Sequence, residues 1–202
     1  MITDAAARLR ARNLRTLALL AALFLLPLVF AFLTYYGSGW RPAGRVNHGV
    51  LITPARPLPA VSLKQLAAQN APSMATPLRG QWSLVYIGDG SCNDACRRSL
   101  FVTRQTRLAL NNDMTRVARV YLVSGECTAC STLAREDPGL ELLDATGVDG
   151  AALLRVFPES AREHELFVVD PLGNLLMSYD ARGDPRGLLE DLKKLLRLSQ
   201  IG

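Results

Sequence analysis

The sequence predicts an α/β domain, with a mixed β-sheet flanked by helices, behind a single N-terminal membrane-spanning helix. Three observations lead to this prediction. Residues 16–36 form one uncharged, largely apolar stretch, short β-branched and aromatic runs alternate with helical patterns after residue 80, and a strand–turn–strand pattern precedes a final amphipathic segment. Alternation of strands and helices favours parallel strands, and a hairpin adds antiparallel ones, so the sheet is expected to be mixed.

The N-terminus has the composition of a membrane anchor. About 20 apolar residues suffice to cross a bilayer, and residues 16–36 contain no charged side chain. Four arginines lie in the basic tail 1–15 before this stretch, which orients the N-terminus toward the cytoplasm. A cleaved signal peptide is the alternative, but its apolar core is usually shorter. We therefore expect a single-pass inner-membrane protein whose C-terminal domain lies in the periplasm.

The charge distribution argues against a nucleic-acid partner. The whole chain carries a formal net charge of +5. Residues 1–15 hold four arginines and one aspartate and so contribute +3, and the rest, with 19 basic and 17 acidic residues, contributes +2. The exported part is therefore nearly balanced and has no basic stripe of the kind that binds nucleic acids.

Residues 37–79 are expected to form a tether. Six of the 11 prolines lie in this segment, with few long apolar patterns between them. Such a composition favours a semi-rigid, partly extended chain. Residues 50–52 could add an edge strand and residues 61–68 a short helix. The ordered domain is then expected over residues 80–202, a length that suits one domain with one core.

The elements of this domain follow from local patterns. Residues 82–87 and 119–123 are rich in β-branched and aromatic residues, as buried strands are. Asp184 and Pro185 suit the cap and first position of a closing helix, which carries leucines on one face. The other expected elements are a helix over 94–112, a helix-like segment opening at 127, a short strand over 140–143, a helix over 149–157 and the strands 166–169 and 174–179.

Two thiols stand where the first core strand turns into a helix. Cys92 and Cys96 are separated by three residues, directly after the strand 82–87. Such a pair is a redox couple, a set of soft ligands for a metal such as Cu(I), or a disulfide that only staples the turn. The start of a helix suits the first two roles, because its dipole favours thiolates.

A second pair, Cys127 and Cys130, follows the second core strand. Two intervening residues at the start of a helix is the spacing of redox-active dithiols. The carboxyl ends of neighbouring parallel strands share one edge of a sheet, so both pairs are expected at that edge. The second pair is a redox partner of the first, part of a thiolate metal site or a local structural disulfide. Four cysteines allow three pairings, and the sequence leaves the choice open.

A dithiol at the end of the first strand of such a sheet is the plan of a thioredoxin-like domain. Residues 78–198 further resemble the Sco/SenC proteins, through the run Gly80-Gln-Trp-Ser-Leu-Val-Tyr-Ile-Gly88, the Cys-x-x-x-Cys pair, the run Phe167-Val-Val-Asp-Pro-Leu-Gly173 and the last amphipathic helix. Those are membrane-anchored, thioredoxin-like copper proteins that assist assembly of cytochrome c oxidase. The resemblance implies the same fold and the same type of function.

The resemblance also implies a copper ligand set of Cys92, Cys96 and a histidine before the strand 166–169. His164 is the histidine at that place, although it is nearer to the strand than in the family and lacks the family's Asp-His-Ser context. Asn93 and Arg97 stand where the family carries prolines. The sequence therefore describes a divergent member.

The sequence favours an accessory factor for cytochrome c oxidase assembly. It would bind Cu(I), or reduce copper-site cysteines, through Cys92 and Cys96, with an oxidase subunit or another periplasmic thiol or copper protein as partner. One alternative is a metal-free thiol-disulfide oxidoreductase in which these cysteines and Cys127 and Cys130 act in relay. Another is a docking module whose disulfides are purely structural. An oxidoreductase would be an enzyme, whereas a copper chaperone would not, and the sequence leaves this choice open.

Overall fold

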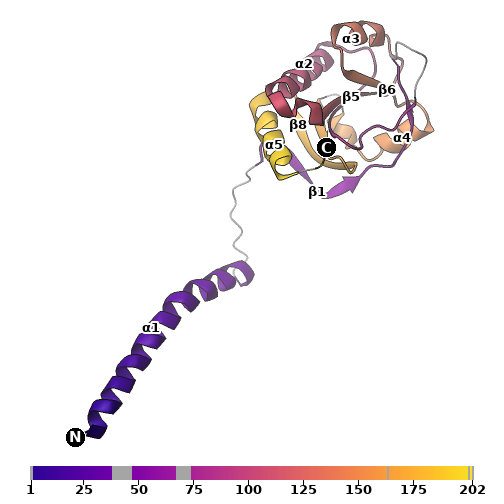
Figure 1. The fold of residues 1–202 in the computed structure, drawn as a ribbon. Helices are drawn as coiled ribbons and strands as arrows, with labels where there is room; N and C mark the ends of the chain where they lie inside the picture. Colours follow the sequence, from indigo (N-terminus) through magenta and orange to yellow (C-terminus); the bar gives the residue numbers. More distant parts are fainter. Residues whose placement is uncertain (1, 38–46, 67–73, 163, 200, 202) are drawn as a thin grey trace. The chain divides into compact units, whose positions relative to one another are not determined.

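The computed structural model of the chain describes residues 2–37, 47–66, 74–162, 164–199 and 201 (Figure 1). They belong to two compact units, Met1–Arg45 and Val46–Gly202. The sequence suggested residue 80 as the start of the ordered domain. The second unit begins earlier because residues 50–57 join its main sheet.

The first unit contains one long helix, α1 (Ile2–Tyr36). Within it, Arg12–Tyr36 has a mean hydropathy of 2.7 and buries none of its apolar window inside the protein. Pro27 lies inside the helix without ending it. The helix is long and apolar enough to cross a membrane, as the uncharged stretch predicted.

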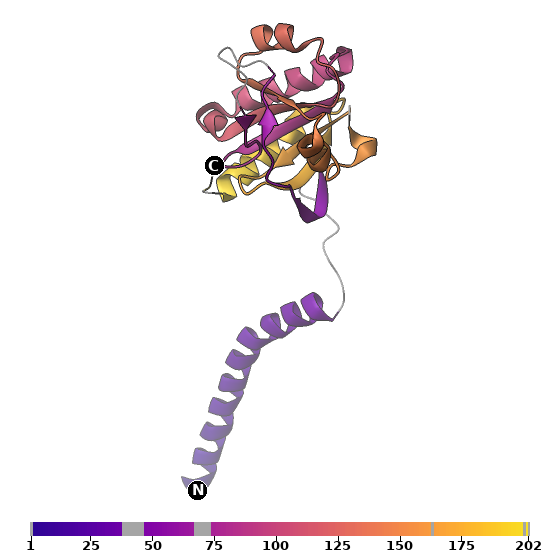
Figure 2. The same ribbon diagram turned by 90° about the vertical axis from the view of Figure 1, so that its right-hand side faces the viewer.

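A six-stranded mixed sheet forms the centre of the second unit (Figures 1 and 2). The parallel part consists of β4, β5 and β6, and β7, β8 and β1 continue the sheet in antiparallel fashion. In spatial order the strands are β1 (Val50–Pro57), β8 (Asn174–Asp180), β7 (Glu165–Val169), β4 (Trp82–Gly88), β5 (Val117–Val123) and β6 (Leu140–Asp144).

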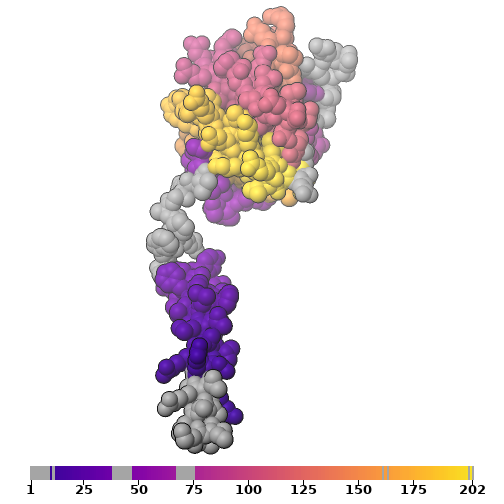
Figure 3. All heavy atoms as spheres, turned by 60° about the vertical axis from the view of Figure 1, so that its left-hand side comes forward, coloured from indigo at the N-terminus to yellow at the C-terminus, as the bar shows by residue number. Residues whose placement is uncertain are grey.

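Helices cover both faces of this sheet, which confirms the predicted fold class. One core lies under α2 (Asp94–Ala109), α3 (Cys130–Glu136) and α5 (Pro185–Leu198), and the other lies under α4 (Val148–Leu154). Figure 3 shows α5 and α2 side by side on the first face. The strands alternate between the two cores. Leu84 and Tyr86 of β4 face the first, and Val85 and Ile87 face the second.

Two expectations for local structure need correction, and one is confirmed. The helix expected over 94–112 ends at Ala109, and a 3₁₀ segment, Asn111–Arg116, follows it. Residues 61–66 are not helical, because β2 (Leu63–Lys64) pairs with β3 (Met74–Ala75) and Gln65 bridges to Leu143 of β6. Residues 67 and 68 of that expected helix lie outside the described chain. The closing helix is capped as predicted, with Asp184 accepting the Arg186 N–H at 2.9 Å.

The start of the second unit is fixed to α5 through one buried carboxylate. Asp191, 4% exposed, accepts the backbone N–H groups of His48 at 2.7 Å and Gly49 at 3.1 Å. The hydroxyl of Tyr179 donates to the same carboxylate oxygen. Burial, and after it this hydrogen bond, raises the pKa of Tyr179, so its hydroxyl stays protonated. The first residues of the domain are therefore held in place rather than trailing from it.

Candidate functional site

Both cysteine pairs lie at one edge of the sheet, as the topology predicted. β4 and β5 are parallel neighbours, and their last residues, Gly88 and Val123, are paired. Each strand leads into a loop that carries one disulfide. Cys92 is bonded to Cys96 with a Cα–Cα distance of 5.0 Å, and Cys127 is bonded to Cys130 at 5.4 Å. Of the three pairings that the sequence allowed, the structure has the local one.

The first disulfide closes the start of α2. Asn93 caps this helix, and its side-chain oxygen accepts the Cys96 N–H at 3.0 Å. Asp94 follows the cap as the first helical residue. Cys92 has a φ of +48°, a left-handed conformation that costs non-glycine residues roughly 1–2 kcal/mol. The disulfide and the cap together hold the chain in this tight turn.

A hydrogen-bonded aspartate precedes the first disulfide. Asp89 accepts both the backbone N–H and the hydroxyl of Ser91, at 2.9 Å and 2.8 Å. These hydrogen bonds lower the pKa of the Asp89 carboxyl, with the Ser91 hydroxyl contributing most. Asp89 is thus a fixed negative charge at neutral pH, and its exposed side chain lies on the solvent side of the loop.

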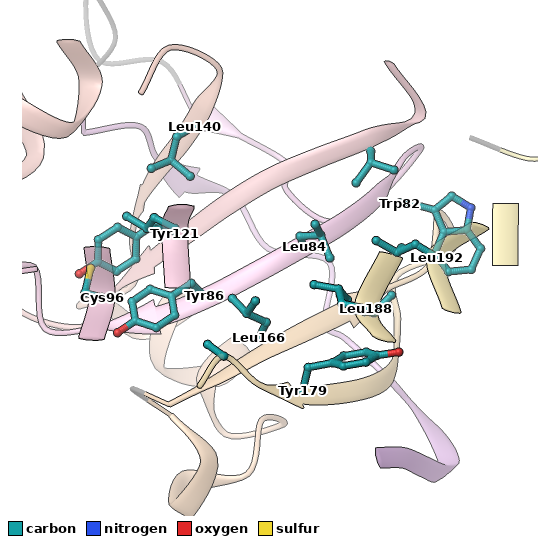
Figure 4. Close-up of a cluster of buried hydrophobic side chains, with 14 of the residues drawn as sticks. Trp82, Leu84, Tyr86, Cys96, Tyr121, Leu140, Leu166, Tyr179, Leu188 and Leu192 are labelled. Carbon is teal, nitrogen blue, oxygen red and sulfur yellow. The ribbon is translucent and has the colours of Figure 1, made fainter. Parts of the chain in front are cut away.

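Tyr121 supports the first cysteine loop, the segment between β4 and α2, from the buried side. It is fully buried in β5, and its hydroxyl accepts the backbone N–H of Gly90 at 3.0 Å. Burial raises the pKa of the Tyr121 hydroxyl, so it stays neutral. Its ring packs on that of Tyr86 with the centroids 5.3 Å apart. Figure 4 shows both rings on the side of the sheet that carries Cys96.

The two cysteine loops touch each other through Gly90. The Ala129 N–H donates to the Gly90 carbonyl at 3.1 Å. A Cβ placed on Gly90 would lie 2.8 Å from the Cys127 Cα and 2.6 Å from the Glu126 carbonyl oxygen, closer than packed atoms approach. Gly90 also has a φ of +89°, which glycine adopts most readily. The absence of a side chain at this position therefore lets the two loops lie against each other.

The four cysteines differ in exposure. Cys92 and Cys96 are each 3% exposed and Cys130 is 7% exposed. Cys127 is only half-buried and packs against the rim of the same core cluster. The pair with the resemblance to a copper site is thus covered, and the second pair has one side chain that solvent reaches.

A buried ion pair holds the helix that begins at Cys130. Arg119 of β5 is 2% exposed and donates two hydrogen bonds to the carboxylate of Asp137, at 3.0 Å and 2.7 Å. Asp137 is the C-terminal cap of α3, directly after its last residue. Arg104 of α2 lies 3.7 Å from the same carboxylate. The pair ties the far end of α3 to the sheet and so fixes the position of the second disulfide.

His164 lies at the same edge but does not complete a ligand group with the cysteines. Tyr86 pairs with Leu166, and continuing this antiparallel register brings His164 level with Gly88. Its exposed side chain lines a pocket of about 400 Å³ together with Gly88 and Ser124. Within the described residues, no three His, Cys, Asp or Glu side chains are arranged to hold a metal ion.

The oxidised state of Cys92 and Cys96 is one reason why these residues and His164 form no metal-ligand group here. Cu(I) prefers thiolate and imidazole donors, and the donor set of Cys92, Cys96 and His164 matches that preference in chemical type. The two sulfurs are bonded to each other here, so neither is a thiolate. Copper binding by these residues therefore requires reduction of the disulfide and movement of His164 toward the pair.

Comparison with models of protein families identifies the family of this domain. The family described as "Transmembrane-like, thioredoxin-like, C-terminal domain" matches residues 82–199, more than half of the chain. The chain belongs to this family. No curated protein sequence matches the chain. The matched residues include every element from β4 to α5 and therefore both disulfides.

Solved structures with this fold include several Sco proteins. Apo Sco1 from Thermus thermophilus has a TM-score of 0.58 and 15% identity, covering 76% of this chain and 99% of its own. Yeast Sco1 with copper bound has a TM-score of 0.56 and 12% identity, covering 76% and 95%. BsSco, described as a cytochrome c oxidase assembly protein with a disulfide switch, has a TM-score of 0.52 and 13% identity, covering 71% and 96%. These neighbours confirm the thioredoxin-like fold.

Sequence reasoning found the cysteines of this transmembrane-like, thioredoxin-like protein but missed the residues that hold them. Gly90 and Tyr121 were not singled out, because no local sequence pattern indicates their contacts with the loops. Arg119 was read as a strand residue only. A charged side chain within a strand predicted to be buried calls for a buried partner, and that signal could have led to Asp137.

Proposed function

We propose that this protein is a membrane-anchored accessory factor for cytochrome c oxidase assembly and that Cys92 and Cys96 form its working pair. In the reduced state the two thiols take up Cu(I) as cargo. Alternatively, they transfer two electrons and two protons to a disulfide of an oxidase copper site and become a disulfide again. In either case the partner is an oxidase subunit or another protein with thiols or copper.

The observation that carries this proposal is the position of the Cys-x-x-x-Cys pair. It follows β4 and opens α2 in a fold shared with copper-bound Sco1. Two soft sulfur donors four residues apart, Cys92 just before the cap of the 16-residue helix α2 and Cys96 in its first turn, suit Cu(I) once they are thiolates. His164 stands at the same sheet edge and supplies the candidate third donor.

The site lies outside the cytoplasm in this proposal. The four arginines before the apolar helix favour a cytoplasmic N-terminus. The domain after α1 then lies in the periplasm, an oxidising compartment in which disulfides persist. Copper sites of respiratory oxidases that are assembled on the outer side of the membrane would be within its compartment.

A Cu(I) titration of the fully reduced, full-length protein tests the proposal. In detergent micelles and without oxygen, competition against a Cu(I) chelator should give one tightly bound equivalent. The variant Cys92→Ala should lose this equivalent, and His164→Ala should weaken it by at least about tenfold, since loss of even an outer-shell partner of a ligand typically costs that much affinity. His48→Ala is the matched control, since His48 is the other histidine of the chain.

Two results would contradict the copper function. One is an absence of binding above the chelator background, and the other is binding that Cys92→Ala leaves unchanged. If copper does not bind but the reduced protein reduces a disulfide of a model copper-site peptide, the reducing function alone remains. If neither activity is present, the disulfides are structural and the domain is a docking module.

A further inference from the structure

We propose that electrons enter this protein at Cys127–Cys130 and pass within the chain to Cys92–Cys96. The donor is a second protein that carries a reduced dithiol. This inference rests on the proposed function and deepens it. It assigns the route by which the covered working pair becomes reduced, and it identifies Cys127 as the residue that meets the donor.

The exposure of the cysteine residues is the first argument. An attacking thiolate must reach one sulfur of a disulfide, so exposure controls which pair reacts. Cys92 and Cys96 are each 3% exposed, whereas Cys127 is half-buried and is the most open of the four cysteines. Cys130 is 7% exposed. A donor protein, with its dithiol on a folded surface, therefore meets Cys127 first.

Contact between the loops is the second argument. Gly90 precedes Cys92 by two residues, and its backbone packs directly on the Cys127 Cα. The hydrogen bond from Ala129 to the Gly90 carbonyl joins the two loops. Cys92, Cys96 and Cys130 also belong to one buried cluster, against which Cys127 packs. Exchange between the pairs is thus intramolecular, between two loops that are in direct contact.

The helices favour transfer in one direction. Cys96 lies in the first turn of α2, which has 16 residues, whereas Cys130 opens α3, which has seven. The start of a long helix stabilises a thiolate. A dithiol whose reduced form is stabilised is the better electron acceptor. We therefore expect electrons to collect at Cys92 and Cys96.

The exchange balances in two steps. A donor thiolate attacks the Cys127 sulfur, and Cys130 leaves as a thiolate. The second donor thiol then resolves the mixed disulfide. The donor is now oxidised, and Cys127 and Cys130 are thiols. One of these, as a thiolate, attacks the Cys92–Cys96 disulfide, and the other resolves the resulting bridge. The Cys127–Cys130 bond forms again, and two electrons and two protons have moved to Cys92 and Cys96.

Time-resolved thiol trapping tests this route. Oxidised full-length protein in detergent is mixed with one equivalent of reduced thioredoxin, quenched with N-ethylmaleimide at intervals, and analysed by mass spectrometry of each cysteine peptide. Label should appear first on Cys127 and Cys130 and later on Cys92 and Cys96. The double variant Cys127→Ser/Cys130→Ser should slow reduction of the first pair by at least about tenfold, because an intramolecular step is lost.

A glycine pair supplies a matched control that keeps all four cysteines. Gly90→Ala introduces a Cβ that collides with the second loop and should slow transfer between the pairs. Gly80→Ala carries similar backbone strain, since Gly80 has a φ of +82°, but a Cβ there meets nothing within 4 Å. Gly80→Ala should therefore leave the transfer rate unchanged while testing for any general effect of strain.

Single serine variants identify the residue of entry. With oxidised glutathione, Cys130→Ser should form a mixed disulfide at the free Cys127 thiol readily. Cys127→Ser should react much more slowly, because its remaining thiol at Cys130 is buried. Equal reactivity of the two variants would contradict entry at Cys127.

The route is overturned if the trapped label appears on Cys92 and Cys96 first, or if the double variant is reduced as fast as the wild type. It is equally overturned if Gly90→Ala and Gly80→Ala transfer electrons at the same rate. These outcomes are separable from failure of the proposed function, because the copper titration starts from protein that is already fully reduced by chemical means.

Discussion

The two disulfides of this domain occupy equivalent places in the fold but different environments. Each follows a parallel strand, and each closes the turn into a helix. The Cys92–Cys96 pair is covered on both sulfur-bearing side chains and opens a long helix, whereas the Cys127–Cys130 pair opens a helix of seven residues and leaves Cys127 half-buried. One sheet edge thus combines a protected pair with an accessible one.

A single strand supports both loops, and it does so in different ways. β5 contributes Tyr121, which holds the first loop through the neutral hydrogen bond to Gly90, and Arg119, which holds α3 through the buried ion pair with Asp137. The first support is a hydrogen bond between neutral groups, and the second is a buried ion pair. Removal of either side chain should therefore affect the two loops to different degrees.

The largest loss of stability is expected when the support of the second cysteine loop by Arg119 is removed. Arg119→Ala leaves the Asp137 carboxylate nearly buried without its main partner, which should cost about 3–5 kcal/mol of unfolding free energy. Urea denaturation of the full-length protein, followed by fluorescence, measures this change. Hydrogen exchange should rise most in α3, around Cys130, and least at the start of α2.

A surface ion pair is the control for this variant. Arg182 and Asp180 are paired at 2.8 Å, but their side chains are 62% and 47% exposed. Arg182→Ala should therefore shift the urea midpoint far less than Arg119→Ala does, because exposed pairs contribute little to stability. Comparable losses for the two arginine variants would mean that Asp137 finds other partners, and the second loop would not depend on Arg119.

An intermediate effect is expected at the first loop. Tyr121→Phe removes the acceptor of the buried Gly90 N–H, and an unsatisfied buried donor costs about 1–3 kcal/mol. The exchange rate of the Gly90 amide, followed by NMR, should rise. Tyr179→Phe also removes a buried hydroxyl with a hydrogen bond, but it acts on Asp191 and should leave the Gly90 amide protected. Unchanged protection in Tyr121→Phe would show that the loop is held by the disulfide alone.

The smallest effect is expected from Ser91→Ala, which acts on the charge beside the first pair. The pKa of Asp89 is lowered in the folded protein, so its contribution to stability is present above the ordinary value of 3.8 and is lost as pH falls through the folded pKa. Ser91→Ala should bring this pKa back toward 3.8, as carboxyl NMR titration would detect. At neutral pH the variant should lose less than about 0.5 kcal/mol, and this difference should vanish in acid. A pKa that stays low would assign the shift to another group.

The comparison also explains which parts of the molecule the sequence predicts. The strands 82–87 and 119–123, the hairpin and the capped last helix have local signals, namely β-branched runs, turn residues and an Asp-Pro start. The meeting of the two cysteine pairs at one edge followed from the rule for parallel strands. These features depend on nearest neighbours in the chain or on general topology, and both can be read without a structure.

The remainder depends on contacts between distant residues. The possible edge strand at residues 50–52 is confirmed, but β1 extends to Pro57 through sequence that looks like a proline-rich tether, because β8 offers an open edge. Neither the fit of Gly90 against Cys127 nor the burial of Cys92 has a local signature, because each arises from the way two loops pack. His164 was placed at the correct edge, but whether it meets the cysteines depends on how the loops after β4 and before β7 pack, which no local pattern gives.

A redox titration resolved by residue tests the central distinction between the two pairs most directly. The full-length protein is equilibrated in dithiothreitol buffers of graded potential, trapped with a maleimide and analysed for each cysteine. We expect two separate two-electron transitions, with Cys92 and Cys96 reduced at a less negative potential than Cys127 and Cys130. Equal or reversed potentials, or two values far below about −300 mV as structural disulfides have, would contradict a working pair that is supplied by an accessible one.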